Sequence, residues 1–518
     1  MKINNKISKG IINVILVIIT FSCNEDFLEK NPLDSLSSET FWQTEEQVIT
    51  GLAGVYANLT ENFLGYERVY FECLSDNASN AITNFEQQNL YEMTIGALNA
   101  GSGEALENMY KQPYKVITAS NYFLDNADNA LADPLLTESE LNIYKAEVRF
   151  LRALAYFDIV QLWGDAPLYT TFPKSLKDIQ VPKSNASEIY QVIEDDLNFA
   201  ISNLPDITYS GHAVKGSAQG LLGKVLLTQE KWADAADVLK TLIDDGKFQL
   251  ANSYKDIFLR GGQSDPGVNR EILFSTKYSA IDVHRISPVQ AGLYLELGQQ
   301  YYIQPFADLA DAYQMSNGED PSSTSLPSAN YANRDPRLDM TVKLPGESWP
   351  NDVPLFSSFT GFVMEKYVDL NLLPLTPDDA FESYNDLVYL RYADVLLMYS
   401  EAKNEVSGPD ESVYKALDDV RGRTGVNMPA VDQGIYSDQS SLREFIRNER
   451  RVELALEGHR YFDLKRWKIA KSKLDGMPTT NGNVMVFKDY NYKFPFSQSE
   501  LDANPELDQN EGYLTGSN

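Results

Sequence analysis

Cysteine and histidine are scarce in this chain of 518 residues, which contains two Cys and three His. Cys23 and Cys73 cannot build the disulfide framework that stabilises small secreted domains. We expect Cys73 to be a small buried apolar side chain. The histidines His212, His284 and His459 are far apart, and none has the spacing of metal ligands. The sequence therefore predicts no metal site.

Motifs that would indicate an enzyme are also missing. The chain has no HExxH, no CxxC and no GxSxG segment. Gly101-Ser102-Gly103 lacks the third glycine of a dinucleotide-binding loop. Gly223-Lys224 is followed by Val225, where a phosphate-binding loop has Ser or Thr. We therefore predict no catalytic residue and no cofactor.

Positive charge is in short supply. The chain has 44 Lys and Arg against 74 Asp and Glu, a formal net charge of −30. Such a field repels phosphate backbones, so we expect no nucleic-acid partner. It also disfavours direct adhesion to anionic membranes. The 43% of hydrophobic residues is nevertheless enough for a sizeable core.

No apolar run reaches the length of about 20 residues that a membrane-spanning helix needs. The run from Ile11 to Phe21 follows three lysines and has the charge and length of a signal-peptide core. It ends at Ser22-Cys23, where a lipoprotein signal is cut and the Cys thiol takes the lipid. Thr20 and Phe21 depart from the usual residues before such a site, and an ordinary secretory signal with an incidental Cys is the alternative. We predict a signal peptide over residues 1–22 and lipidation of Cys23.

Helical patterns dominate the rest of the chain. Capping-box patterns at Thr44–Gln47 and Asn185–Glu188 each precede an apolar-periodic run. Residues 145–163 predict a long helix that is apolar nearly all round, which is typical of a helix buried by several neighbours. Short strand-like pieces occur at residues 271–278 and 484–488. The predicted fold class is mainly α.

Pairs of helices recur at irregular spacing. Residues 217–244 indicate helix, turn and helix, with small residues at Ala218, Gly223 and Ala235 that let two helices approach closely. This is typical of a tetratricopeptide-like unit. Residues 390–405 with 413–424 repeat the plan, and residues 145–163 with 188–203 form a third candidate. Long inserted loops rich in Pro, Gly, Ser and Asn, such as residues 261–267 and 317–327, are where binding residues usually lie.

A stripe of carboxylates stands out near the C-terminus. Glu449, Glu453 and Glu457 are four residues apart, His459 follows them, and several arginines surround them. Such a cluster can do acid/base chemistry or hold a metal ion. The structural interpretation is that these Glu and Arg side chains pair with each other and with adjacent helices. We favour the structural interpretation.

Several ordered motifs resemble the SusD/RagB family of outer-membrane nutrient-binding lipoproteins over essentially the whole chain. The acidic Asn24-Glu25-Asp26 also resembles the export signal of Bacteroidetes surface lipoproteins. Phe494-Pro495-Phe496 stands where the family usually has Pro-Ile-Pro. The matching pieces lie at residues 27–32 (FLEKNP), 40–42 (TFW), 146–157 (AEVRFLRALAYF), 162–168 (LWGDAPL), 390–398 (LRYADVLLM), 420–425 (VRGRTG), 449–454 (ERRVEL), 457–467 (EGHRYFDLKRW) and 509–513 (QNEGY).

The resemblance implies one helical domain over residues 23–518, with an N-terminal half of about 23–245 and a C-terminal half of about 246–518. It implies a lipid-anchored protein at the cell surface of the outer membrane, which captures an oligosaccharide or polysaccharide for a TonB-dependent, SusC-like transporter. It also implies that the Glu and Arg stripe serves packing. The family's ligand site lies in variable loops, so no motif carries it over.

Sugar rings stack on aromatic faces while short polar side chains bind the hydroxyl groups. A polar segment lies beside Tyr70, and further aromatic residues fall in predicted loops. We therefore predict a ligand site made by Tyr70, Asp76, Asn77, Asn80, Tyr294, Tyr301, Tyr302 and Trp349.

Three other functions stay open at this point. The same scaffold could bind a different nutrient, such as a peptide. A helical glycoside hydrolase would need two carboxylates about 5 to 9 Å apart in one cleft. A scaffold that contacts only proteins would bind no small ligand. We expect the non-catalytic glycan-binding function.

Overall fold

The computed structural model describes residues 41–60, 62–80, 86–278, 303–321, 331–348, 359–372 and 385–513. Buried hydrophobic side chains from Trp42 to Tyr513 form one contacting cluster, to which both halves of the chain contribute. Cys73 is a buried side chain within it, as predicted. The residues of the predicted signal peptide and Cys23 lie outside the described ranges.

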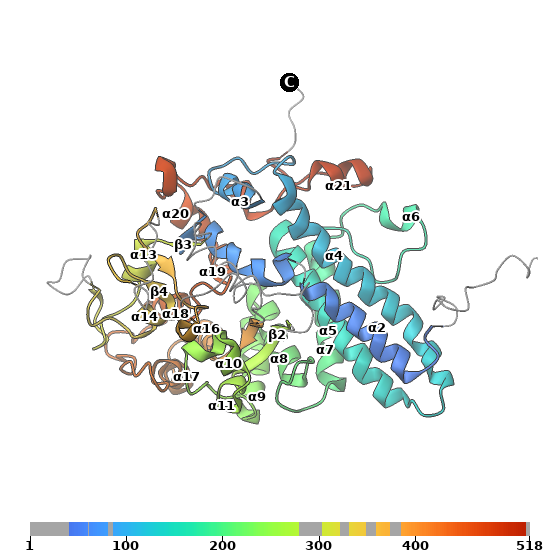
Figure 1. Ribbon diagram of the computed structural model, residues 1–518, viewed down its shortest axis with the longest axis horizontal. Helices are drawn as coiled ribbons and strands as arrows, with labels where there is room; N and C mark the ends of the chain where they lie inside the picture. The colour runs from blue at the N-terminus through green and yellow to red at the C-terminus, as the bar shows by residue number, and fades with distance from the viewer. Residues whose placement is uncertain are drawn as a thin grey trace, which may run out of the picture.

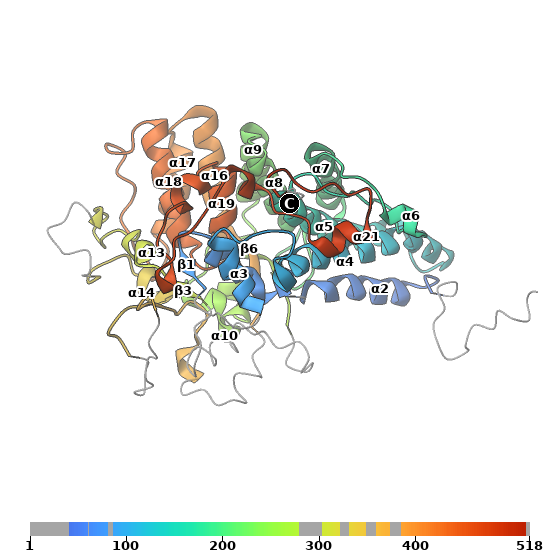
Figure 2. The ribbon, with the colours of Figure 1, turned by 90° about the horizontal axis from the view of Figure 1, so that it is seen from above.

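The longer helices form an array in which each packs on the next: α4 on α5, then α7, α8, α9 and α16, with α17 and α18 both on α16. Figures 1 and 2 show this array running from the N-terminal helices on the right to the C-terminal ones on the left. The predicted mainly α fold is confirmed. Its main helices are α2 (Glu45–Ala57), α4 (Gly103–Asn126), α5 (Glu138–Trp163), α7 (Ala186–Asn203), α8 (Lys215–Thr228), α9 (Trp232–Asp245), α16 (Tyr392–Ser407), α17 (Glu411–Arg421), α18 (Gln439–Glu453) and α19 (Arg460–Arg466).

The central helix α5 is apolar nearly all round because it is covered by α2, α4, α7 and α8. It begins seven residues before the predicted start, because Thr137 and Glu140 form a capping box. Gly164, with a φ of 72°, ends it. The predicted box at Thr44 is also present, with Gln47 as its second member.

The predicted pair over residues 217–244 is confirmed as α8 and α9. Two glycines allow side chains of neighbouring elements to approach the backbone of α8 closely. A Cβ on Gly223 would lie 2.4 Å from Leu239 Cδ2 on α9, and a Cβ on Gly220 would lie 2.7 Å from Leu390 Cδ2. The backbone of α8 therefore makes direct contact with its neighbours.

Helices α16 and α17 confirm the second predicted pair, and α5 with α7 the third. Two details differ. Residues 390–391 belong to a strand, β6 (Leu387–Arg391), and α16 begins after it. The segment 261–267, predicted to be a loop, contains most of α10 (Arg260–Gln263) and the start of α11 (Pro266–Asn269). Residues 322–327 of the other predicted loop lie outside the described ranges.

Within the described residues, three small antiparallel sheets join segments far apart in the sequence. β2 (Ile272–Thr276) pairs with β6, β1 (Ala78–Ser79) with β3 (Gln304–Pro305), and β4 (Val342–Lys343) with β5 (Val363–Met364). The predicted strand at 271–278 is confirmed as β2. The one predicted at 484–488 is wrong, because that stretch makes a single isolated bridge from Val484 to Pro478. A strand needs a longer partner ladder than that bridge provides.

The remaining short helices are spread over both halves of the described chain. They are α3 (Glu86–Thr94), α6 (Leu176–Ile179), α13 (Ala307–Asp311), α14 (Arg337–Thr341), α20 (Ala470–Leu474), α21 (Gln498–Ala503) and the 3₁₀ helices at Asn58–Thr60, Asn62–Leu64, Tyr66–Leu74, Ala127–Ala132, Lys255–Phe258, Leu370–Leu372, Thr480–Gly482 and Asp489–Tyr492. None of the described helices combines the length and hydropathy that crossing a membrane requires.

Candidate binding face

Three segments meet at the small sheet formed by β1 and β3. Ala78 pairs with Pro305 and Ser79 with Gln304, and the Phe306 N–H donates to the carbonyl of Asn77 at 2.9 Å. The Gln304 side chain accepts a hydrogen bond of 2.8 Å from the Phe359 N–H. Figures 1 and 2 place β3 at the left of the molecule, away from α2 and α6. We call this junction of residues 77–80, 303–306 and 359–364 the binding face.

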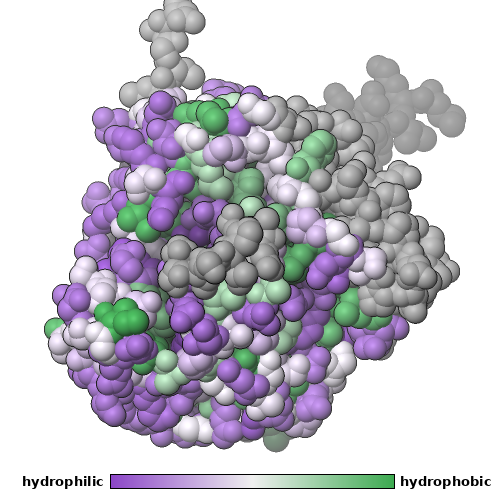
Figure 3. All heavy atoms as spheres, turned by 90° about the vertical axis from the view of Figure 1, so that its left-hand side faces the viewer, coloured by the Kyte–Doolittle hydropathy of each residue, from purple (hydrophilic) through white to green (hydrophobic). Residues whose placement is uncertain are grey.

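Phe359 is the exposed aromatic residue of this face. Its side chain is 69% exposed, whereas its neighbours Gln304 and Phe362 are buried. The part of the left-hand surface that is coloured in Figure 3 is mostly hydrophilic, with hydrophobic residues in small separate groups. An exposed phenyl ring is suited to stacking on a sugar ring.

Phe359 is not among the ligand residues predicted from the sequence. It stands in the polar stretch Ser357-Ser358-Phe359-Thr360-Gly361, and Gly361 has a φ of 83°, which indicates a turn. The sequence signal for an exposed aromatic residue was a single Phe inside a polar turn that ends in glycine. The prediction concentrated instead on tyrosines and tryptophan.

Tyr70 and Asp76 are buried. Tyr70 lies in the 3₁₀ helix Tyr66–Leu74 rather than in the predicted loop and is 8% exposed. The Asp76 carboxylate accepts hydrogen bonds from Arg460 Nε at 2.8 Å and Nη2 at 2.9 Å. Burial by itself raises the pKa of Asp76, but the hydrogen bonds from Arg460 and the charge of Arg451 outweigh it and lower the pKa to about 2. Asp76 is therefore a buried anion that holds its segment to α18 and α19.

Asn77 and Asn80 are buried as well. The Asn77 amide donates to Glu72 Oε2 at 2.7 Å, and its carbonyl oxygen accepts from Arg451 Nε at 2.8 Å. The other oxygen of Glu72 accepts the backbone N–H groups of residues 458–460. Ligand contact by Tyr70, Asp76, Asn77 or Asn80 would require this packed segment to open, which is a physical argument against a direct role.

The other four predicted ligand residues, Tyr294, Tyr301, Tyr302 and Trp349, lie outside the described residues. The sequence nevertheless connects them to the binding face. Tyr301 and Tyr302 directly precede Ile303, and Trp349 stands ten residues before Phe359. Their contact with a ligand stays a prediction.

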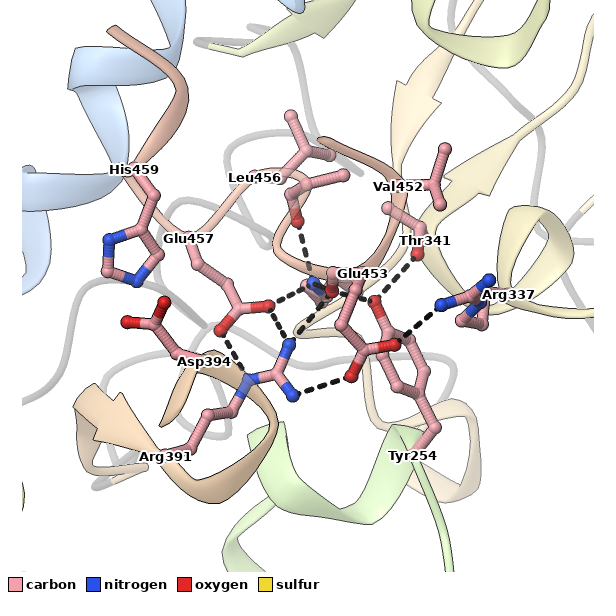
Figure 4. A network of polar contacts seen from close by, with 12 residues as sticks. Tyr254, Arg337, Thr341, Arg391, Asp394, Val452, Glu453, Leu456, Glu457 and His459 are labelled. Carbon is pink, nitrogen blue, oxygen red and sulfur yellow. Dashed lines mark hydrogen bonds and ion pairs between the residues drawn. The ribbon is translucent and has the colours of Figure 1, made fainter. Parts of the chain in front are cut away.

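The carboxylate stripe lies in a buried network of ion pairs (Figure 4). Glu453 contacts three guanidinium groups, those of Arg337 at 2.8 Å, Arg391 at 2.7 Å and Arg423 at 2.6 Å. Burial raises the pKa of Glu453, but these charges outweigh it and hold the pKa well below its usual range. Glu453 is a permanently charged structural group.

The other two members of the stripe are paired in the same way. Arg421 donates to Glu449 at 2.7 Å, and Lys366 donates to Glu457 at 2.6 Å. The pairing interpretation is confirmed, but the partners come from outside α18, the helix that carries Glu449 and Glu453. Among the described residues, no group of three or more His, Cys, Asp or Glu is placed to hold a metal ion.

His459 is also enclosed. Its Nδ1 lies 3.1 Å from Lys224 Nζ, which contacts Asp394 at 3.0 Å. Burial, and then the charge of Lys224, lower the pKa of His459 well below its usual value. The imidazole is therefore neutral near pH 7 and is held in the interior.

Comparison with known proteins gives matches over both halves of the chain. The SusD family model matches residues 298–513, and a model described as "Starch-binding associating with outer membrane" matches residues 26–227. The chain belongs to the SusD family. The resemblance expected from the sequence motifs is thus confirmed.

SusD-family relatives match over nearly their full length. SusD-like protein P25 of Formosa agariphila is 28% identical, over 97% of this chain and 98% of that protein. A SusD-like protein of Bacteroides fragilis superposes with a TM-score of 0.77 at 24% identity, over 93% of this chain and all of the other. A SusD-like carbohydrate binding protein of the same species has a TM-score of 0.75 at 25% identity, over 90% of this chain and all of the other.

Proposed function

We propose that this SusD-family chain captures an oligosaccharide at the outer surface of the cell and does not cleave it. The observation that carries the proposal is the exposed ring of Phe359 on the binding face, whose backbone N–H is held by the buried Gln304 side chain of β3. A rigid scaffold that presents an aromatic ring to solvent suits non-covalent capture of a sugar. The carbohydrate-binding description of one B. fragilis relative supports the same ligand class.

Capture without cleavage fits the carboxylates. A glycosidase positions two carboxyl groups on either side of the scissile bond. Glu449, Glu453 and Glu457 are instead buried and engaged by arginine and lysine side chains. These three carboxylates are therefore not accessible to a substrate.

The proposal includes the place of the protein in the cell. A lipid on Cys23 would hold the body at the outer membrane, in keeping with the family description of outer-membrane association. Captured oligosaccharide would pass to a TonB-dependent, SusC-like transporter. The strongly negative net charge leaves the lipid as the route of membrane attachment.

Calorimetric titration tests the ligand class. Residues 24–518 would be titrated with a panel of polysaccharides, oligosaccharides and peptides, and each mixture analysed for cleavage products. We expect binding of a glycan without products, and a Kd that Phe359→Ala raises roughly fivefold, the loss of about 1 kcal/mol of aromatic contact. Leu135→Ala, which truncates an 82% exposed side chain on the turn between α4 and α5, is the matched control. Binding of peptides alone, or release of shorter sugars, would contradict the proposal.

A further inference from the structure

A second concave site lies far from the binding face. α4, the segment 167–173, α6 and α21 enclose a groove with a volume of about 800 Å³. That volume falls within the usual range for small-ligand sites. Figures 1 and 2 both place α6 and α21 at the right of the molecule and β3 at the left. Neither Gln304 nor Phe359 lines this groove.

One wall of the groove is a stripe of three tyrosines and one threonine. Tyr110, Tyr114, Thr118 and Tyr122 follow each other at every fourth residue of α4, so they share one face of the helix. The step along the axis is about 6 Å, which is comparable to the length of one pyranose residue. The stripe therefore repeats at about the period of a sugar chain.

Tyr169 and Phe172 pack against this stripe and widen the aromatic wall. The ring centroids of Tyr114 and Tyr169 lie 5.8 Å apart, and those of Tyr122 and Phe172 lie 4.9 Å apart, both in edge-to-face geometry. These contacts fix the orientation of each ring without stacking the two rings on each other. All four rings are half-buried, so part of each faces the open groove.

Hydrogen bonds make the aromatic wall rigid. The Tyr114 hydroxyl donates to the carbonyl of Pro167 at 2.6 Å, and the Tyr169 hydroxyl donates to the carbonyl of Ile179 at 2.8 Å. Both hydroxyls are thus satisfied within the protein. The rings are pre-organised, which reduces the entropy lost when a ligand binds.

Two polar groups of the groove stay available. Among the described residues, neither the Thr118 hydroxyl nor the half-buried Glu500 carboxylate has a hydrogen-bond partner, and both residues line the cavity. Lys111, next to them, is paired with Glu107 at 2.7 Å. One hydroxyl and one carboxylate between aromatic rings are donors and acceptors that suit sugar hydroxyl groups.

We propose that this groove is a second carbohydrate site of the chain, which takes a neutral oligosaccharide in an extended conformation along α4. The proposal rests on the proposed function. The ligand is expected to be neutral because Lys111 and Lys115 are balanced by Glu107 and Glu500 at the groove, and because the chain as a whole repels anions. Two separate sites would let the protein hold a long glycan at two points, which raises avidity without tighter contacts.

The test compares two variants with the same substitution. Thr118→Trp fills the groove, whereas Thr241→Trp places the same side chain on the exposed face of α9. The probes are laminarihexaose, cellohexaose, maltohexaose, mannohexaose and xylohexaose, titrated by calorimetry. For a hexaose that binds, we expect two equivalents per chain in the wild type and in Thr241→Trp, and one in Thr118→Trp.

Glu500→Gln is the second variant, because it preserves the size of a half-buried side chain that lines the groove. We expect it to weaken one of the two binding events roughly tenfold through loss of a charge-assisted hydrogen bond, while Phe359→Ala weakens the other. If the chain binds only one equivalent of hexaose, and neither Thr118→Trp nor Glu500→Gln changes that binding, the second site is overturned. The proposed function is then unaffected. If none of the five hexaoses binds, the second site as proposed here fails. The titration with polysaccharides, oligosaccharides and peptides described above then decides whether the proposed function holds.

Discussion

Arg391 and Glu457 form a bidentate ion pair in the interior, with Arg391 Nε donating to Glu457 Oε2 and Nη2 to Oε1, both at 2.8 Å. Each residue is at most 2% exposed. Arg391 ends β6, and Glu457 lies between α18 and α19, so the pair ties the strand to the last helices of the array. A buried pair of this kind adds little net stability over an apolar pair, but losing one partner is costly because it leaves a buried charge uncompensated.

Glu453 is the position where this cost is largest, because three arginines face it. We expect Glu453→Gln to lower the free energy of unfolding by about 3–5 kcal/mol. Glu444→Gln on the same helix is the control, because Glu444 is 69% exposed and its pair with Arg447 contributes about 1 kcal/mol or less. Denaturant titration measures both. Equal effects of the two substitutions would contradict the structural role assigned to Glu453.

The helices of this protein were predictable because their signals are local. The capping residues of α2 and α7 and the apolar surface of α5 are properties of neighbouring residues. The sequence predicted that the carboxylate stripe is paired, but it did not predict which residues pair with it. Arg337 and Arg391 are 62 or more residues away from Glu453 in the sequence, and a local pattern cannot indicate such distant partners.

The ligand site was harder to predict for the same reason. A short polar run such as residues 75–80 is typical of an exposed loop. It is buried here because Arg451 and Arg460, about 375 residues later, neutralise Asp76 and bind Asn77. Exposed Phe359 and the groove along α4 depend on tertiary packing, so neither the ring's exposure nor the packing of Tyr169 and Phe172 against α4 follows from local sequence.

The pKa of Asp76 predicts a pH dependence of stability. Its pKa is about 2 in the folded chain, against an ordinary value of 3.8. A lowered pKa stabilises the folded state above the ordinary pKa, and this stabilisation is lost as the pH falls from about 4 to about 2. The contribution at pH 7 is about 2–3 kcal/mol.

Asp76→Asn should therefore be less stable than the wild type at pH 7 and should show a flatter fall between pH 4 and 2. Urea unfolding at a series of pH values measures this. Asp308→Asn is the matched control, since Asp308 also contacts Arg451 but its side chain is 60% exposed. If the free energies of unfolding of Asp76→Asn and of the wild type change in parallel over the whole pH range, the pKa assigned to Asp76 is refuted.

A pair of glycine substitutions separates packing from helix propensity. Gly54 in α2 has open space around it, so Gly54→Ala should stabilise the protein by about 0.5–1 kcal/mol. Gly223 in α8 has Leu239 atoms at 2.4 and 2.6 Å from the position of a Cβ. Gly223→Ala should destabilise the protein by about 1–3 kcal/mol, because overpacking outweighs the better propensity. Thermal unfolding reports both, and a stabilising effect at both sites would mean that α8 and α9 can move apart freely.

Cys23 decides whether the proposed capture takes place at a membrane. Lipid chains on this residue would provide stable anchoring by burial of their methylene groups, whereas the described helices offer no membrane span. In a Bacteroidetes host, we expect the wild-type chain in the membrane fraction and degraded by protease added to intact cells. Cys23→Ala should leave the membrane fraction, and Cys73→Ala, the other cysteine, should stay in it. Retention of Cys23→Ala in the membrane would mean that another contact, such as the transporter, holds the protein there.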